Sequence, residues 1–218
     1  MMFSLGKLPM AANNIIEKRK ERMKIVALLA SPRTDGNSST LANRLTSAAA
    51  AKGAEVQAFK LNSLNYRGCQ ACNACKLLTD HCVLNDDLAE VLAEVAKADV
   101  LVLATPVYYG DVTGQLKLFI DRSFSYYTPD FRTSCKPSRL ASGKKLIFIQ
   151  TQGNPDQTFF GDIYSRYSTF FKRYGFDDSS LVRACGVSEP GQVNENQVVL
   201  DRLDSVTAQL FPDGALSW

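Results

Sequence analysis

Short apolar segments alternate with amphipathic ones along most of the chain. Residues 24–30 form a nearly continuous apolar run, which is typical of a strand buried on both faces of a parallel sheet. Comparable runs predict further strands at residues 55–61, 99–104, 146–149 and 180–186. Apolar residues at helical spacing predict a helix after each strand: one capped by Ser38 or Ser39, one opened by Asp86 and Asp87, one around residues 116–120, one over residues 158–174 and one over residues 199–210.

This repeated alternation predicts an α/β fold. A five-stranded parallel sheet should be covered by helices on both sides, since right-handed crossovers place the helices there. The loops that follow the strands then share one edge of the sheet, where ligands bind in folds of this kind. We therefore expect the functional residues in the loops after the first four strands.

Length and composition limit the architecture and the partners. The chain has 218 residues, 45% hydrophobic and 22% charged, which suits one domain with a sizeable core. Residues 1–24 hold six basic and two acidic residues, so the rest is close to neutral and lacks the basic stripe of a nucleic-acid binder. No stretch approaches the roughly 20 apolar residues of a membrane helix. Residues 1–14 lack the apolar stretch of a signal peptide, so we expect a cytoplasmic protein with reduced thiols.

Four of the six cysteines lie within one fourteen-residue stretch: Cys69, Cys72, Cys75 and Cys82. The C-x2-C-x2-C run lets three thiolates converge on one inorganic centre, and the fourth can complete the coordination, much as in ferredoxin-type iron–sulfur ligation. Two alternatives stay open, namely a zinc site in which His81 replaces Cys82, and buried thiols without a metal. Cys135 and Cys185 are isolated in the sequence and are interpreted as structural.

The segment after the first strand is suited to binding an anion. Residues 31–40 read Ser-Pro-Arg-Thr-Asp-Gly-Asn-Ser-Ser-Thr and lead into a predicted helix. Hydroxyl, amide and guanidinium groups, together with the backbone N–H groups of the helix N-terminus, can surround a phosphate there. The segment has neither the Gly-Lys-Ser/Thr of a Walker loop nor the G-x-G-x-x-G of nicotinamide-binding domains. A polar turn that caps the helix is the alternative interpretation.

Four separated motifs together resemble one known family. They are Ser31-Pro-Arg33 with Gly36-Asn-Ser38, Thr105-Pro-Val-Tyr-Tyr-Gly110, Leu116-Lys-Leu-Phe-Ile-Asp-Arg122 and Thr151-Gln-Gly153. In this order they are similar to the NAD(P)H-dependent FMN reductase family of the flavodoxin superfamily, and the cysteine segment resembles its branch of iron–sulfur flavoproteins. The resemblance implies a flavodoxin-like three-layer sandwich with strand order 2-1-3-4-5, FMN at the carboxyl edge, NAD(P)H as electron donor, and a homodimer or homotetramer.

The resemblance also implies which residues hold the cofactor. The FMN phosphate would be held by Ser31, Arg33, Asn37, Ser38 and Ser39. The ribityl chain and isoalloxazine ring would lie beside Pro106, Val107, Tyr108, Tyr109 and Gly110, with Gln152 and Gly153 at the other edge of the ring. The flavin would carry the chemistry, so no catalytic side chain is predicted. The four clustered cysteines are predicted to be competent to bind a [4Fe–4S] cluster, either on the same edge of the sheet as the FMN or within reach of a partner subunit's flavin across an interface.

Three functional hypotheses follow. The first is an FMN-dependent oxidoreductase that passes electrons from NAD(P)H to small acceptors or redox proteins. The second is a flavodoxin-like electron carrier without a substrate of its own, and the third is a zinc-stabilised module without flavin. Residues 23–218 are expected to form the FMN-binding domain. Residues 1–22 are expected to be an N-terminal extension, whose helix over residues 11–22 packs on a neighbouring subunit.

Overall fold

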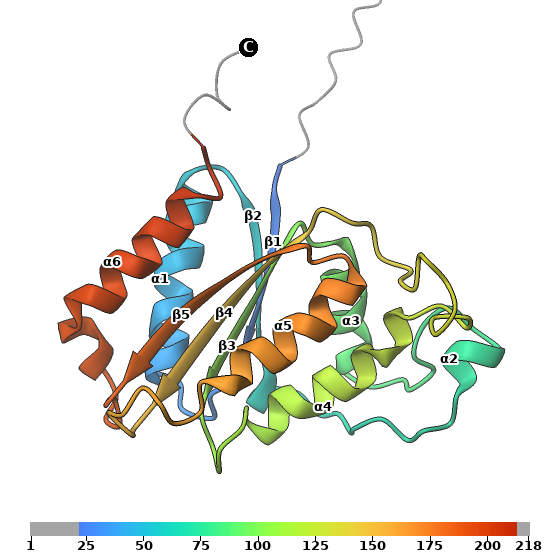
Figure 1. The fold of residues 1–218 in the computed structure, drawn as a ribbon, viewed down its shortest axis with the longest axis horizontal. Coiled ribbons are helices and arrows are strands. Elements are labelled where there is room, and N and C mark those ends of the chain that lie inside the picture. The colour runs from blue at the N-terminus through green and yellow to red at the C-terminus, as the bar shows by residue number, and fades with distance from the viewer. Residues whose placement is uncertain (1–21, 213–218) are drawn as a thin grey trace, which may run out of the picture.

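Five parallel strands form the central sheet of the computed structural model, which describes residues 22–212 (Figure 1). They are β1 (Lys24–Leu29), β2 (Glu55–Lys60), β3 (Val100–Pro106), β4 (Lys145–Gln152) and β5 (Asp178–Cys185), in the order β2-β1-β3-β4-β5. The predicted flavodoxin-like fold and its strand order are confirmed. Residues 1–21, with nearly all of the predicted N-terminal helix, lie outside the described residues.

Side-chain alternation along the strands builds a separate core on each face of the sheet. In β1, Ile25 and Ala27 face one layer, whereas Val26 and Leu28 face the other. The first layer contains α1 (Asn37–Ala51) and α6 (Gln197–Ala208); the second contains α3 (Leu88–Lys97), α4 (Gly114–Arg122) and α5 (Asp162–Tyr174). Figure 1 shows the two groups of helices on opposite sides of the sheet. Because both faces are covered, the central strands are mostly apolar, and polar residues such as Gln150 and Gln152 lie toward the carboxyl end of β4.

The start of α1 differs from the prediction. The N-cap residue is Gly36, which makes no side-chain cap, rather than Ser38 or Ser39. A Cβ at position 36 would lie 2.3 Å from the Ser31 hydroxyl oxygen, so only glycine fits this close approach. Both serines are therefore inside the first turn of the helix, at the carboxyl edge of the sheet.

The start of α5 also differs, because the helix begins at Asp162 instead of near Thr158. Phe160 has a φ of 62°, which belongs to the left-handed region and cannot continue into a right-handed helix. The segment between β4 and α5 is consequently a loop, and it lies beside the other loops of the carboxyl edge.

The connection from β2 to α3 is the longest excursion from the sheet. It contains a 3-10 turn, η1 (Leu61–Ser63), and one short helix, α2 (Ala74–Leu77), which lies far out from the strands in Figure 1. Further 3-10 turns follow α4 and β5, namely η2 (Ser123–Tyr126) and η3 (Gln192–Glu195). Between residues 22 and 212 no helix has the length and hydrophobicity to cross a membrane.

Candidate functional site

The loop after β1 and the start of α1 form a corner suited to an anion. Ser38 and Ser39 are buried there, and the Ser38 hydroxyl has no hydrogen-bond partner among the described residues. The first backbone N–H groups of a helix have no partner within the helix, and no acidic side chain lies in the first turn of α1. A phosphate oxygen would satisfy these donors, and the helix dipole would favour its charge. The corner therefore fits the predicted phosphate loop.

Two of the predicted phosphate ligands tie this corner to the segment after β5. The Asn37 amide donates to the Glu189 carbonyl at 2.9 Å, and its oxygen accepts from the Val193 N–H at 3.2 Å. Arg33 Nη1 donates to the Ser188 carbonyl at 2.8 Å. Because the Asn37 side chain is bonded at both ends, its contribution to a phosphate site would come from its backbone N–H. The side chain instead holds the corner in shape.

The loop after β3 is a tight turn that presents two tyrosines. Tyr108 and Asp111 exchange backbone hydrogen bonds at 2.9 and 3.1 Å, with Tyr109 and Gly110 between them. Both central residues have positive φ, 52° and 82°, as in a type I′ turn. Tyr109 is a bulky residue in this strained region and its side chain is fully exposed, whereas Tyr108 is about half exposed. Backbone strain combined with an exposed aromatic side chain is typical of turns that bind ligands.

Asp111 anchors this turn to α5. Its carboxylate accepts from the Tyr167 hydroxyl at 2.9 Å and lies 3.1 Å from Arg166 Nη1. Burial raises the pKa of Tyr167 strongly, and the bond to Asp111 adds to that shift, so the hydroxyl stays a donor. Asp111 was not among the predicted site residues, although an aspartate that closes a Tyr-Gly turn is a recognisable signal.

The loop after β4 is held by an arginine from the neighbouring strand. The Gln152 amide donates to the carbonyls of Asn154 and Asp156, at 3.0 and 3.2 Å. Its oxygen accepts from Arg183 Nη2 at 2.7 Å, and Arg183 also donates to the carbonyls of Gln157 and Phe159. The predicted flavin-edge residue Gln152 is therefore buried and builds the loop, while Gly153 and the following backbone form its surface. Nothing in the sequence pattern indicated Arg183.

Hydrogen bonds bring the three loops together at one edge, as predicted. The Val107 N–H donates to the Thr151 carbonyl at 2.7 Å, which joins the loops after β3 and β4. Thr113, the N-cap of α4, donates through its hydroxyl to the Ala30 carbonyl at 3.1 Å, which joins the loop after β1. The edge is therefore a pre-formed surface built by backbone groups.

All four clustered cysteines line one cavity of about 170 Å³. Cys69 and Cys72 are exposed, whereas Cys75 and Cys82 are partly buried, and all six cysteines of the chain are unpaired thiols. Within residues 22–212, no three His, Cys, Asp or Glu side chains converge closely enough to hold a single metal ion. The four thiols therefore share one cavity without converging on a single point.

An arginine forms the inner wall of this cavity. The Arg122 side chain is fully buried, and its Nη1 donates to both carboxylate oxygens of Asp86 at 2.6 Å. Burial alone would raise the pKa of Asp86, but hydrogen bonds from Arg122 and from the Arg67 N–H together lower it. Arg122 Nε is buried with no hydrogen-bond partner among the described residues. This unpaired donor beside four thiols suits an electron-rich group, such as the sulfides of a cluster.

Two further cations pin the cysteine loop to the body of the protein. Lys76 Nζ donates to the carbonyls of Phe124 and Tyr127, each at 2.8 Å, and lies 3.6 Å from Cys75 Sγ. Arg139 Nη2 donates to the Cys75 carbonyl at 2.9 Å. Burial lowers the pKa of Lys76, with nearby Arg139 acting in the same direction. Hydrogen bonds from side chains, and not hydrogen bonds between backbone groups, thus hold the cysteine loop against the rest of the protein.

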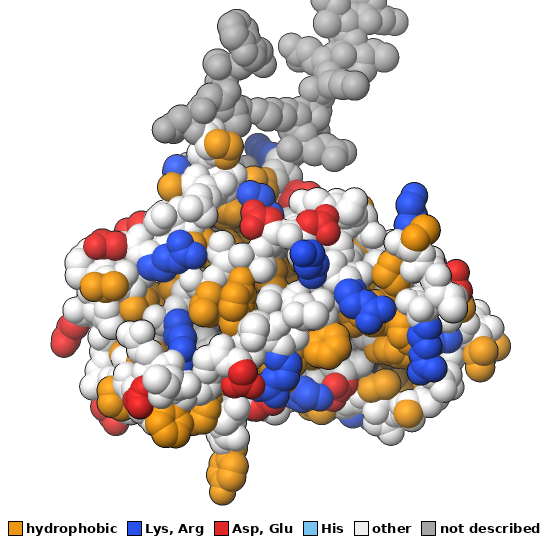
Figure 2. Space-filling model, viewed as in Figure 1, with side chains coloured by type: hydrophobic (Ala, Val, Ile, Leu, Met, Phe, Trp, Pro, Cys, Tyr) orange, Lys and Arg blue, Asp and Glu red, His pale blue; other side chains and the backbone are white. Residues whose placement is uncertain are grey.

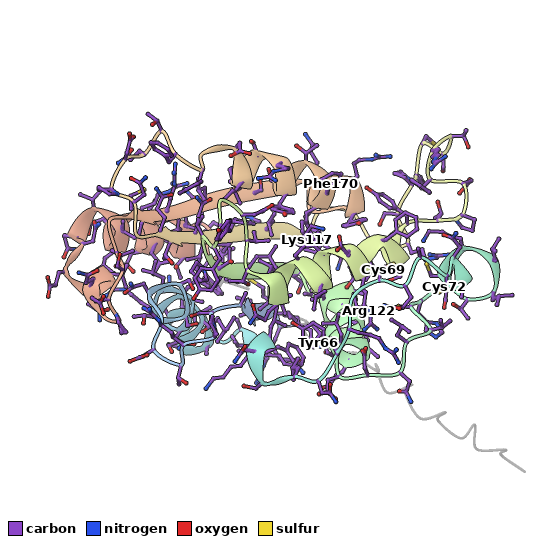
Figure 3. All side chains as sticks on the ribbon, turned by 90° about the horizontal axis from the view of Figure 1, so that it is seen from below. Tyr66, Cys69, Cys72, Lys117, Arg122 and Phe170 are labelled. Carbon is purple, nitrogen blue, oxygen red and sulfur yellow. The ribbon has the colours of Figure 1, made fainter. Side chains whose placement is uncertain are left out.

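The position of the cavity corrects one expectation. Figure 3 shows Cys69 and Cys72 beyond the end of α4, close to Arg122, and not among the loops of the carboxyl edge. The Tyr108–Asp111 turn precedes the other end of α4, and a nine-residue helix is about 13 Å long. The loop after β2 leaves the edge because residues 64–73 run outward along α4. The two regions therefore lie at opposite ends of one helix.

Two smaller expectations can be compared with the structure. His81, the alternative zinc ligand, is largely exposed and contacts Asp80, and it does not line the cysteine cavity. Cys135 is exposed in the loop between η2 and β4, so its side chain does not pack in the core as a structural cysteine would. Cys185 is partly buried at the end of β5.

Known proteins share this sequence pattern and this fold. A family model described as NADPH-dependent FMN reductase matches residues 23–163. An iron-sulfur flavoprotein of Methanocaldococcus jannaschii is 37% identical over 101 residues, which is 46% of this chain and 52% of that protein. An FMN-dependent NADH:quinone oxidoreductase of Pseudomonas fluorescens is 33% identical over 127 residues, or 56% of this chain and 61% of that protein. The chain thus matches about half the length of these curated relatives.

A solved structure shows the same fold over nearly the whole chain. The NAD(P)H:quinone oxidoreductase from Methanothermobacter marburgensis superimposes with a TM-score of 0.65, covering 87% of this chain and 98% of that one. The sequence identity is 18%, so this likeness concerns the fold.

Proposed function

Since the chain belongs to the NADPH-dependent FMN reductase family, we propose that it is an FMN-dependent oxidoreductase that takes electrons from NAD(P)H. The unpartnered Ser38 hydroxyl at the start of α1 is the observation that carries this proposal. It lies buried where the phosphate of a flavin nucleotide would supply the missing acceptor. When bound, FMN would accept a hydride and release electrons singly or in pairs.

Different residues of the carboxyl edge would bind different parts of FMN. Ser31, Ser38, Ser39 and the first N–H groups of α1 would bind the phosphate, with Arg33 close by. The Pro106–Gly110 segment would lie beside the ribityl chain and the ring, and Tyr108 or Tyr109 could pack on the ring face. The backbone at Gly153 would supply donors to the far edge of the ring, because Arg183 and Gln152 hold that loop rigid. Rigid donors tune the redox states of a flavin without moving.

Spectroscopy of the purified protein tests the cofactor and the reaction separately. We expect a yellow protein that releases about one FMN per chain when it is denatured, and whose flavin bands bleach on anaerobic addition of NADPH or NADH. A flavin that binds but does not bleach would indicate the electron carrier instead. A colourless protein that takes up no FMN during reconstitution would contradict the proposal.

We further propose that Cys69, Cys72, Cys75 and Cys82 ligate a [4Fe–4S] cluster. Their common cavity, the unpaired Arg122 Nε and the similarity to an iron-sulfur flavoprotein support this assignment. A chain with free thiols in such a site also suits a reducing compartment, which supports the cytoplasmic location expected from the sequence.

Iron and sulfide analysis after anaerobic reconstitution tests the cluster. We expect about four irons and four sulfides per chain, and a brown colour that fades in air. Joint replacement of Cys72 and Cys75 by Ser should abolish the iron, whereas Cys135→Ser, which changes a cysteine outside the cavity, should keep it. Iron content below about one per chain, or unchanged content in the double variant, would exclude the cluster.

Association with other chains is the remaining part of the proposal. Leu77 and Leu78 on α2 are exposed by 77% and 82%, which is unusual for adjacent leucines. We propose that this apolar tip contacts a second copy in a homodimer or homotetramer. Light scattering of the parent and of a Leu77→Ser, Leu78→Ser double variant tests this, and an unchanged mass would argue that the tip serves a redox partner instead.

A further inference from the structure

A groove between α4 and α5 lies outside the carboxyl edge and adjoins the cysteine cavity, with which it shares Cys69 and Phe124. Its volume is about 610 Å³, which falls within the range of small-molecule sites. Aromatic rings form most of its wall, including those of Phe124, Tyr127, Phe131, Tyr167 and Phe170. Figure 3 shows Phe170 on α5, Lys117 on α4, and Cys69 toward the far end of α4. The wall is suited to a flat aromatic ring.

One polar group in this wall lacks a partner. Tyr127 is only 5% exposed, and its hydroxyl forms no hydrogen bond with any described residue. Its ring is 4.6 Å from that of Tyr174, yet the Tyr174 hydroxyl accepts from Ser123 instead. Burial raises the pKa of Tyr127, so the hydroxyl is protonated at neutral pH and can donate. A buried hydroxyl in the groove wall that has no partner among the described residues is available to an acceptor that enters from outside.

Three charged side chains line the groove: the cations Lys117 and Arg173 and the carboxylate Asp121. The guanidinium of Arg173 lies 5.2 Å from the centre of the Tyr127 ring. Lys117 also lines the groove, with Asp121 as its salt-bridge partner at 2.5 Å. Figure 2 shows the blue Lys and Arg side chains interspersed with orange hydrophobic ones over α4 and α5. A negatively charged oxygen would be attracted to the Arg173 end, where the Tyr127 hydroxyl could donate to it.

From these observations we propose that the α4–α5 groove binds a planar aromatic anion, such as an aromatic carboxylate or phenolate. Its ring would lie between the aromatic walls, and its charged oxygen would meet Tyr127 and Arg173. A concave site with a buried hydroxyl suits a small molecule better than the flatter surface of a second protein chain. The occupant would contact Cys69, which also lines the cysteine cavity, and Tyr167, which holds the Tyr108–Asp111 turn through Asp111. The assignment does not depend on the flavin.

Calorimetric titration of the FMN-loaded, oxidised protein with naphthalene-2-carboxylate tests the proposal. We expect one site in the parent, with affinity weakened about tenfold by Tyr127→Phe and by Arg173→Gln, each of which removes a charge-assisted hydrogen bond. Phe170→Ala should weaken binding about fivefold by removing part of the wall. The controls Phe159→Ala and Arg202→Gln change exposed residues of the same types outside the groove and should bind as the parent does. The uncharged analogue naphthalene-2-methanol should bind at least tenfold more weakly than the carboxylate.

Several results would overturn the assignment. Equal affinities for the parent and the groove variants would place the ligand elsewhere, and no binding up to millimolar concentration would leave the groove without this function. A ligand that displaces FMN or perturbs its absorbance would occupy the flavin edge. If groove variants lower the mass in light scattering and the parent binds no ligand, the groove is a subunit interface. Since FMN content is measured in the same samples, a flavin-free protein that still binds the carboxylate would contradict only the proposed oxidoreductase function.

Discussion

The carboxyl edge and the cysteine loop are built in different ways. At the edge, backbone N–H and C=O groups join the three loops, and the buried side chains of Asn37, Thr113 and Gln152 complete the bonding. In the cysteine loop, three long cationic side chains, Arg122, Lys76 and Arg139, make the principal connections to the body. One region is an extension of the sheet, whereas the other is attached to it at a few points.

This difference predicts how each region responds to the replacement of a single side chain. A surface formed by many backbone bonds changes little when one side chain is removed, so its binding groups can be replaced one by one. A loop held by a few buried cations loses much of its order when one of them is lost, because the remaining partner is left unpaired. We expect the largest effects on folding in the cysteine loop and smaller, local effects at the carboxyl edge.

Replacement of Asp86 by Asn should give the largest loss of stability. The change leaves the fully buried Arg122 without its counter-charge, which typically costs about 3–5 kcal/mol. Asp121→Asn is the matched control, because it breaks the exposed Lys117–Asp121 pair of α4 and should cost less than about 1 kcal/mol. Urea denaturation measures both free energies of unfolding. If both variants lose the same free energy of unfolding, the buried Asp86–Arg122 pair stabilises the fold no more than the exposed pair does.

The same pair predicts a dependence of stability on pH. The pKa of Asp86 is lower in the folded protein than its ordinary value of 3.8, so the pair stabilises the fold fully above that value. Its contribution is lost as the pH falls below 3.8 through the lower folded pKa. The Asp86→Asn variant lacks this contribution, and the difference in stability between parent and variant should therefore shrink on acidification. A difference that stays constant down to pH 2.5 would contradict the assigned direction.

Arg139→Met should loosen the cysteine loop with a smaller loss of overall stability, about 2 kcal/mol, because charged hydrogen bonds to the Cys75 and Ser125 carbonyls disappear. The specific readout is the rate at which Cys75 reacts with iodoacetamide in the metal-free protein, which should rise about tenfold if local opening exposes it. Arg132→Met, in the same loop but at an exposed position, is the control. An unchanged rate in Arg139→Met would show that the loop does not depend on this anchor.

Replacement of both Arg33 and Ser38 by Ala should weaken FMN binding by about tenfold or more, since it removes one charge-assisted and one neutral hydrogen bond to the phosphate. The fold should be retained, because the backbone of the edge is unchanged. Ser47→Ala, at an exposed position of the same helix, should bind FMN like the parent. Fluorescence titration with FMN measures all three proteins. Unaltered affinity in the double variant would mean that the phosphate lies elsewhere.

Tyr109→Asn should have the smallest effect on stability, and in the opposite direction. Asn followed by Gly is the preferred sequence of a type I′ turn, so relief of strain should stabilise the fold by about 0.5–1 kcal/mol. Loss of the aromatic side chain should weaken FMN binding if Tyr109 packs on the ring. Thermal unfolding without FMN and titration with FMN separate the two effects. Destabilisation of the FMN-free variant would show that Tyr109 is held by contacts and not under strain.

The sequence by itself determined the architecture and the chemical character of both regions. Continuous apolar runs at 24–30 and 99–104 are typical of strands buried on both faces of a parallel sheet, and their alternation with amphipathic segments favours that architecture. Parallel strands must then bring the loops after β1, β3 and β4 to one edge, so their convergence followed from local patterns. The four cysteines of the 69–82 segment are close in sequence, and their lining of one cavity could be anticipated for the same reason.

Only the tertiary structure decided how these residues are used. Asn37 and Gln152 look like ligands in the sequence, but their amides are bonded within the protein by carbonyls and an arginine that lie far away along the chain. The pairing of Asp86 with Arg122 spans 36 residues. It brings the cysteine loop to the far end of α4 instead of the carboxyl edge of the sheet. The local sequence shows which polar and ligand-binding groups a segment contains. The partners of those groups depend on the packing of distant segments, which no local pattern contains.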